Sequence, residues 1–207
     1  MSQESPQTTD LVEFAVASRT IEGESECGDD YAVRPYDNGV LVAVVDGLGH
    51  GPEAAVAARI ALETLTRYAH EPVVLLVTRC HGALRKTRGV VLSLASFNAR
   101  RNTMVWLGVG NVEGVLLRAN PQGKRPRETL ISVGGVVGFQ LPSLRAISVP
   151  VYPGDTLVFA TDGIRTEFMY NLALGPPQSM ARRICDRFSR DTDDALVLVG
   201  CYRGLEQ

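Results

Sequence analysis

The sequence predicts an α+β fold, an antiparallel β-sandwich with α-helices packed on its outer faces. The predicted elements run as strands, then two helices, then a series of strands, one helix and a last strand. This order lacks the regular alternation of strand and helix that builds a parallel sheet, and it is typical of helices laid against antiparallel sheets. The 207 residues contain no repeat and no interdomain linker, so one domain is expected.

The first strands are predicted from apolar patterns and a turn signal. Residues 11–19 alternate between apolar and polar side chains well enough to form a half-buried strand. Residues 31–36 and 39–45 are two further strand-like runs on either side of the turn signal that Asn38 and Gly39 provide. Asn-Gly between apolar runs is a strong hairpin signal, so these two runs are expected to pair.

The predicted helices show apolar residues at helical spacing. One covers residues 50–69, with Pro52 in its first turn, and a second begins near Pro72. A third covers residues 176–190. The remaining predicted strands are residues 89–99, 102–108, 113–118, 144–151, 156–160 and 195–201. Residues 120–128 are polar and contain Pro and Gly, so they are expected to form a solvated loop.

Composition and charge exclude several classes of function. The formal net charge is −2, which gives neither a basic field for nucleic acid nor a cationic face for a membrane. No apolar run approaches the roughly 20 residues that span a bilayer, and the polar residues 1–10 lack the apolar centre of a signal peptide. We therefore expect a cytoplasmic protein with a flexible N-terminus at residues 1–10 and a single domain at residues 11–202. The four cysteines show no paired spacing typical of a zinc site or a disulfide framework.

Four acidic positions stand at the ends of predicted strands. Asp46 and Asp162 follow apolar strands, whereas Asp29 and Asp193 precede strands. In an antiparallel sheet the end of one strand lies beside the start of its neighbour, so all four carboxylates can converge on one edge.

The predicted hairpin brings two of these carboxylates close together. If Asn38 and Gly39 form its two-residue loop, Tyr31 faces Asp46 across the pair of strands. Asp29 then lies one diagonal step from Asp46, within reach of a shared ion. A register built on a different loop would move this pairing by a residue or two.

Clustered carboxylates predict a metal site. Their mutual repulsion raises their pKa values unless positive charge lies among them, and Arg165, beside Asp162, is the one base close in sequence. A metal ion is the simpler compensation, and oxygen ligands favour hard ions such as Mg²⁺ or Mn²⁺. Gly47 permits close approach of the backbone, and its carbonyl is a further candidate ligand.

Each acidic motif has a simpler interpretation when it is taken alone. A single Asp-Gly is most often a turn, and Asp193 with Asp194 is most often a solvated strand start. The glycine-rich residues 46–51 could cradle a phosphate before a helix, but they lack the G-x-G-x-x-G pattern and a P-loop lysine. The combination of all four motifs favours metal binding.

Together the motifs resemble those of the type-2C (PPM) metal-dependent protein serine/threonine phosphatases. The segments that stand in that family's order are Cys27-Gly28-Asp29-Asp30-Tyr31, Asp46-Gly47-Leu48-Gly49-His50-Gly51, Thr161-Asp162-Gly163 and Asp193-Asp194. The resemblance spans about residues 11–202 and looks closest to the small bacterial branch of sporulation and stress regulators, in particular to RsbX-type stressosome feedback phosphatases. It implies a four-layer α-β-β-α sandwich, in agreement with the element order.

The resemblance also implies a role for each acidic residue. Asp46 would bridge two Mn²⁺ or Mg²⁺ ions, with the Gly47 carbonyl on one ion and Asp162 and Asp193 on the other. Asp46, Asp162 and Asp193 are therefore the candidate catalytic residues, while Asp29 would support the site directly or through water. A water between the two ions would be deprotonated and attack phosphorus, and no phosphoenzyme would form.

Some features depart from the animal enzymes of this family. Leu48 stands where those enzymes carry the histidine of an Asp-Gly-His triplet, a candidate general acid, and His50 is interpreted as a helix-start histidine near the mouth of the site. Glutamates precede Asp29 where those enzymes have a phosphate-binding arginine. Leaving-group protonation and phosphate capture are therefore unassigned. Asp30 and Asp194 are interpreted as neighbours of ligands rather than ligands.

Three functional hypotheses follow. The first is a Mn²⁺- or Mg²⁺-dependent phosphatase acting on phosphoserine or phosphothreonine of a regulatory protein, and the resemblance implies STAS-domain scaffold proteins of a stressosome as substrates. The alternative is a non-catalytic phosphoprotein-binding module of the same fold, against which the complete acidic set argues. A metal-dependent hydrolase of small phosphate esters is the third, although no obvious nucleotide-binding element is present.

Overall fold

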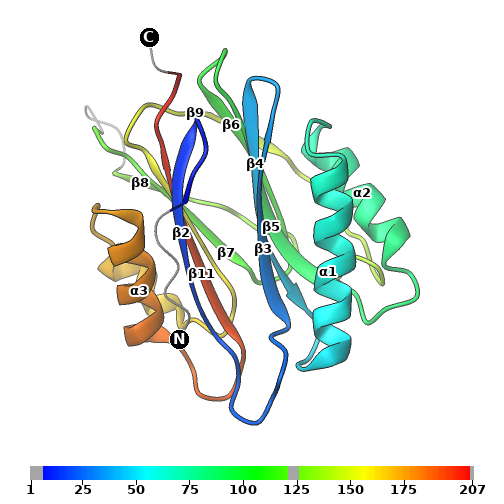
Figure 1. The fold of residues 1–207 in the computed structure, drawn as a ribbon. Helices are drawn as coiled ribbons and strands as arrows, with labels where there is room; N and C mark the ends of the chain where they lie inside the picture. The colour runs from blue at the N-terminus through cyan, green and yellow to red at the C-terminus, as the bar shows by residue number, and fades with distance from the viewer. Residues whose placement is uncertain (1–6, 121–125, 206–207) are drawn as a thin grey trace.

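Two antiparallel sheets stack face to face in a computed structural model that describes residues 7–120 and 126–205 (Figure 1). In spatial order, sheet A consists of β1 (Gln7–Thr8), β2 (Val12–Arg19), β11 (Ala195–Tyr202), β10 (Thr156–Ala160), β7 (Glu113–Leu117) and β8 (Arg127–Thr129). Sheet B consists of β3 (Asp29–Tyr36), β4 (Gly39–Gly47), β5 (Val90–Asn98), β6 (Thr103–Val109) and β9 (Ile147–Pro150). Neighbouring strands in both sheets are antiparallel, as the element order predicted.

Helices cover the outer faces of both sheets. Helices α1 (Pro52–Arg67) and α2 (Val73–Ala83) pack on sheet B, and α3 (Pro177–Phe188), which follows the 3-10 helix η1 (Thr166–Asn171), packs on sheet A (Figure 1). The result is the predicted four-layer α-β-β-α sandwich. Within the described residues, no helix is long and apolar enough to cross a membrane.

Strand β4 is buried on both faces, which explains its continuous apolar sequence. Val40, Val42 and Val44 belong to the core between the sheets. The alternate residues Leu41 and Ala43 pack into the layer between sheet B and its two helices. Successive strand residues point to opposite faces, so a central strand covered on both sides requires apolar residues at every position.

The hairpin register differs by two positions from the expected one. Tyr36 pairs with Gly39, so the loop consists of Asp37 and Asn38, and Asp29 lies directly opposite Asp46. Asn38 takes the left-handed conformation with a φ of 60°, which asparagine tolerates better than most residues. Gly39 belongs to the strand instead, because a Cβ there would lie 2.3 Å from the Tyr36 ring. Gly39 leaves room for the Tyr36 ring and is not part of the turn. The sequence pattern did not distinguish these two roles of a glycine.

The two segments expected to be irregular contain short strands. Within the N-terminal segment 1–10, residues 7 and 8 form β1 by pairing with β2, and residues 1–6 lie outside the described residues. Of the loop expected at 120–128, residues 121–125 also lie outside them, while β8 begins at Arg127 and pairs with β7. Both strands are too short to show a period in the sequence.

A buried ion pair ties the strands together at the end of β10 that lies away from Asp162. Arg118 donates to Asp155 Oδ2 at 2.7 Å and also pairs with Glu128. Asp155 accepts two further hydrogen bonds, from the amides of Ala119 at 3.0 Å and Tyr152 at 3.1 Å. The side chains of Arg118 and Asp155 are only 6% and 2% exposed. A charge that has been removed from water in this way depends strongly on its partner.

We expect Arg118→Met to lower the free energy of unfolding by about 3–5 kcal/mol, because the buried Asp155 carboxylate loses its charged partner. The exposed pair between Arg19 and Asp191 provides the control, and Arg19→Met is expected to cost no more than about 1 kcal/mol. Urea denaturation of both variants measures the difference. Equal costs would show that the Arg118 pair contributes nothing beyond a surface contact.

Candidate metal centre

The four predicted acidic positions come from both sheets at one end of the sandwich. Asp29 begins β3 and lies directly opposite Asp46, the penultimate residue of β4. Asp162 follows β10 and Asp193 precedes β11, and these two strands pair with each other in sheet A. The sequence predicted convergence on one sheet edge. The structure instead brings together two pairs of carboxylates, one pair from each sheet.

Thr161 connects the two halves of this site. Its hydroxyl donates to Asp29 Oδ2 at 2.7 Å and accepts from the Leu196 amide at 2.8 Å. Its own amide donates to the Leu196 carbonyl at 3.0 Å. Thr161 is fully buried, so the bond to Asp29 runs between the sheets without contact with solvent. In the sequence Thr161 stands out only as a neighbour of Asp162, because a contact with a residue so distant in the chain leaves no local pattern.

Asp194 lies beside the predicted ligands and anchors the segment that leads into β3. Its Oδ1 accepts from the Ile21 amide at 2.9 Å, and its Oδ2 accepts from the Gly28 amide at 2.7 Å. The side chain is buried, and both of its oxygens already have partners. The interpretation of Asp194 as a neighbour of ligands stays a prediction.

Asp30 points away from the acidic cluster. Its carboxylate accepts from the amide of Tyr31 at 2.8 Å. Burial raises the pKa of Asp30, while this hydrogen bond and the positive charge of Arg59 on α1 lower it. Adjacent strand residues point to opposite faces, so Asp30 faces α1 when Asp29 faces the cluster.

Asn111 is a contact of the site that the sequence analysis missed. Its side-chain amide donates to Asp162 Oδ2 at 2.6 Å from the connection between β6 and β7. In the sequence Asn111 follows Gly110, and a Gly-Asn pair is typical of a turn. The contact orients Asp162, and only the fold reveals it.

Two glycines allow the backbone around the site to pack closely. A Cβ on Gly47 would lie 2.2 Å from the Ala54 carbonyl oxygen in the first turns of α1. A Cβ on Gly163 would lie 1.8 Å from the carbonyl oxygen of Asp194. Real side chains do not tolerate such contacts, so α1 approaches Asp46 and the β11 lead-in approaches Asp162 only because these residues are glycines.

Burial and mutual repulsion raise the pKa values of the two opposing carboxyls. Burial is the largest cause for both, and it raises the pKa of Asp29 to about 8 and that of Asp46 to about 9. The hydrogen bond from Thr161 partly offsets the shift at Asp29. The negative charges of Asp162 and Asp193 raise the pKa values of both residues. The carboxylates of the two sheets therefore lie close enough to interact electrostatically.

Asp193 is influenced by the same cluster. Burial is the largest cause that raises its pKa, and the charge of Asp162 raises it further. The amide of Asp194 and the charge of His50 lower it.

The donor set fits a hard divalent cation. Several carboxylates surround one region with little positive charge to compensate them, and a bound cation would supply that charge. Within residues 7–120 and 126–205, no three His, Cys, Asp or Glu side chains are grouped closely enough to hold an ion by themselves. Mg²⁺ keeps several waters and takes only one or two carboxylates per ion, so this arrangement suits ions held jointly by carboxylates, a backbone carbonyl and water.

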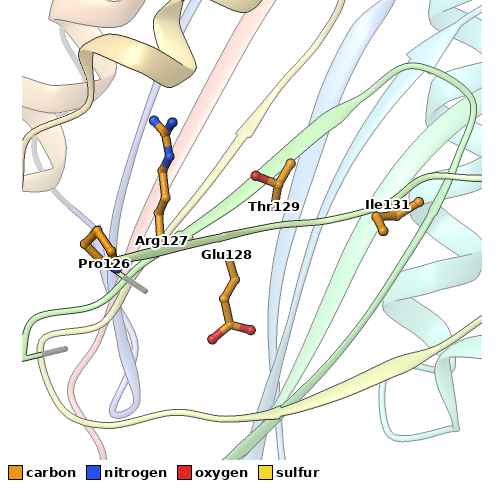
Figure 2. Close-up of a pocket in the computed structure, with 5 residues that line it drawn as sticks. All are labelled: Pro126, Arg127, Glu128, Thr129 and Ile131. Carbon is orange, nitrogen blue, oxygen red and sulfur yellow. The ribbon is translucent and has the colours of Figure 1, made fainter. Parts of the chain in front are cut away.

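Two surface hollows lie elsewhere. One lies beside β8 and is lined by Pro126, Arg127, Glu128, Thr129 and Ile131 (Figure 2). In Figure 2 Arg127 and Glu128 point to opposite sides of the strand. The other lies between β3 and α1 and includes Asp30 and Arg59. Neither hollow is lined by the four converging carboxylates.

The fold and the site together indicate a class of protein. A four-layer α-β-β-α sandwich of two antiparallel sheets is the fold of the type-2C phosphatases. The fold class predicted from the sequence is thereby confirmed by solved structures of this type.

The chain belongs to the Stage II sporulation protein E (SpoIIE) family, whose model matches residues 36–200. It is 26% identical over 143 residues to "Phosphoserine phosphatase RsbX" of Bacillus subtilis (strain 168), which covers 69% of this chain and 70% of that protein. A solved chain described under "The bacterial stressosome: a modular system that has been adapted to control secondary messenger signaling" is 30% identical, with a TM-score of 0.82, and the match covers 91% of this chain and 98% of that one. The structure of RsbX in complex with magnesium has a TM-score of 0.84 at 22% identity, covering 96% of this chain and 98% of that chain.

These relationships confirm the recognition and the enzyme class predicted from the sequence. The protein is a serine/threonine phosphatase of the type-2C fold, related to the Rsb stress-response regulators, and its fold is one that is solved with a divalent metal. The roles of the individual site residues stay predictions.

We expect Gly47→Ala to abolish phosphatase activity and to lower the free energy of unfolding by about 1–3 kcal/mol, because its Cβ overlaps the Ala54 carbonyl. Gly82→Ala in α2 is the matched control, since a Cβ there meets no atom within 4 Å. That variant should keep full activity and gain up to about 1 kcal/mol from helix propensity. Activity on a generic phosphatase substrate and urea denaturation measure both effects. If Gly47→Ala retained wild-type activity and stability, the close packing of α1 would be unimportant to the site.

Without a bound cation, the free energy of unfolding should fall as pH rises between about 4 and about 9. In the folded chain Asp29 and Asp46 keep their protons up to about pH 8 and 9, but in the unfolded chain they lose them near 3.8. The folded state therefore binds more protons across this window, so the free energy of unfolding falls as the pH rises.

Urea denaturation in the presence of a chelator, at several pH values across this window, measures the slope. Saturating Mg²⁺ should stabilise the protein more at the alkaline end, where binding no longer has to displace protons. Asp46→Asn should flatten the metal-free profile. A wild-type profile that is already flat would contradict the raised pKa values.

Proposed function

We propose that the protein hydrolyses phosphoserine or phosphothreonine on a regulatory phosphoprotein, with two Mn²⁺ or Mg²⁺ ions bound among the converging aspartates. The observation that carries this proposal is the direct opposition of Asp29 and Asp46 under burial that raises both pKa values. Two opposing carboxylates, one buried and one half-buried, repel each other where the two sheets meet, and bound cations would relieve this repulsion.

The proposed ligands are divided between the sheets. Asp46 and the Gly47 carbonyl, from β4, would bind on the side of sheet B, with Asp29 supporting them directly or through water. Asp162 and Asp193, from sheet A, would complete the site. When bound, divalent ions generate a strong nucleophile from water at neutral pH and stabilise charge on the phosphoryl group.

The neighbouring residues orient these ligands. Thr161 directs one oxygen of Asp29, and Asn111 directs one oxygen of Asp162. Asp194 positions the backbone that carries Asp29 through its bond with Gly28. Contacts of this kind commonly change metal affinity or activity by about 10- to 100-fold when they are removed.

The substrate is proposed from the relatives. RsbX carries the description of a phosphoserine phosphatase, and a 30%-identical chain belongs to a structural description of the bacterial stressosome. We infer that the substrates of this protein are phosphorylated STAS-domain scaffold proteins of a stressosome. Nucleic acid and membranes are not part of this proposal, and a cytoplasmic location goes with these substrates as a prediction.

Asp46→Asn is expected to lower activity on a phosphorylated STAS protein by roughly 100-fold or more while the fold remains intact. Asp30→Asn is the matched control, because Asp30 is an adjacent acid that faces α1 rather than the cluster, and its activity should stay near wild type. A chelator should abolish wild-type activity, and added Mn²⁺ or Mg²⁺ should restore it. Full activity of a correctly folded Asp46→Asn protein would disprove the metal mechanism.

If the folded protein bound the phosphorylated STAS protein but released no phosphate with any divalent metal, the binding-module alternative would replace the enzyme. Comparable rates on a phosphopeptide and on free phosphometabolites would instead favour the small-ester hydrolase.

A further inference from the structure

His50 makes a charged contact with a residue far away in the sequence. Its Nδ1 lies 2.6 Å from Glu24 Oε1, in the segment that leads from β2 to β3. The same glutamate lies against the next residue, since a Cβ on Gly51 would be 2.6 Å from Glu24 Oε2. His50 is therefore more than a helix-start histidine, because Glu24 fixes the position of its ring.

The contact determines which ring nitrogen is available. An ionised carboxylate has only acceptor atoms, so Nδ1 carries the hydrogen that it donates to Glu24. Nε2 is then left for another partner, and the side chain is 60% exposed. The ring belongs to the loop that continues directly from Asp46 and Gly47, and it lies near enough to Asp193 to lower the pKa of that carboxyl.

The charges around this histidine come from four segments. Glu24 approaches from the β2–β3 connection, and the charge of His50 reaches Asp193 before β11. On the remaining sides, Arg88 before β5 lies over Gly49 and pairs with Glu53 of α1. Carboxylates thus outnumber the bases in the segments around the ring.

We propose that His50 is the general acid of the phosphatase and that Glu24 positions it. This assignment rests on the proposed function, because the reaction requires a donor for the oxygen that leaves phosphorus. Serine and threonine alkoxides are poor leaving groups, and a positioned acid typically accelerates such steps by about 10²- to 10⁴-fold.

The reaction balances with the groups present. The oxygen of a water molecule forms a bond to phosphorus while the bond between phosphorus and the serine oxygen breaks, and that electron pair stays on the serine oxygen. The serine oxygen takes the proton from His50 Nε2, which yields a free serine and inorganic phosphate. The attacking water gives up its own proton to solvent, and neutral His50 is reprotonated from solvent before the next cycle.

Other nearby groups are poorer donors. Arg88 cannot be deprotonated in a protein, so it can attract phosphate but cannot transfer a proton. Burial raises the pKa of the Cys27 thiol to about 12, which makes this side chain a weak acid. Histidine, in contrast, changes charge within the physiological range.

The decisive test compares two leaving groups on the metal-loaded protein. His50→Asn should lower kcat on a phosphoserine peptide by roughly 100-fold or more. Its kcat on p-nitrophenyl phosphate, whose leaving group departs without a proton, should stay within about threefold of wild type. The exposed His70 in the α1–α2 connection provides the control, and His70→Asn should change neither rate.

Glu24→Gln tests the positioning role with a readout other than activity. In ¹⁵N spectra of the imidazole groups, the His50 signal should lose its preference for hydrogen on Nδ1, because glutamine no longer supplies an acceptor carboxylate. The rate on the phosphoserine peptide should fall by an intermediate factor, while p-nitrophenyl phosphate hydrolysis and Mn²⁺ affinity should stay unchanged.

Failure of this assignment is distinguishable from failure of the metal site. Equal losses on both substrates in His50→Asn, or no loss on either, would overturn the assignment of the acid while leaving the metal proposal intact. Asp46→Asn should lower both rates together. If it spared both, the metal mechanism would fail, whatever His50 does.

Discussion

The hydrogen bond from Thr161 to Asp29 is the constraint around which the site is organised. It crosses from sheet A to sheet B at 2.7 Å between two buried side chains. Because β3 pairs with β4 in one register, the position of Asp29 determines that of Asp46. Because Thr161 bonds to the backbone of β11 through Leu196, the same contact relates both carboxylates to Asp162 and Asp193.

The core supports this arrangement against electrostatic repulsion. Strand β4 is apolar on both faces, so its end is held in place by two layers of packing and not by the acidic cluster itself. The free energy that burial provides in these layers, roughly 25 cal/mol per Å² of apolar surface, can offset carboxylates whose pKa values are raised to about 8 and 9. Gly47 then lets α1 approach the end of β4 closely.

Local patterns predicted the layers and the acidic positions, but not how the site is assembled. The apolar run of β4 and the helical spacing of apolar residues in α1 are local signals. The structure contains both elements where these signals predicted them. The hairpin register was wrong because Gly39 fits a turn and a ring contact equally well in sequence. Thr161 and Asn111 were missed as contacts because their partners lie 132 and 51 positions away. Contacts at such separations depend on how the two sheets stack, and no period in the sequence encodes that.

The segment between β2 and β3 positions residues for both proposed tasks of the site, metal binding and proton donation. Asp194 accepts hydrogen bonds from Ile21 and Gly28, at the two ends of this segment, and so closes it into a loop. Glu24 lies between these anchors, and its amide donates to the Ile21 carbonyl at 3.2 Å. The carboxylate that holds Gly28, and with it Asp29, therefore also determines where Glu24 meets His50. A shift of this loop would displace a proposed metal ligand and the proposed acid together, which explains why a buried aspartate, and not a flexible surface contact, anchors it.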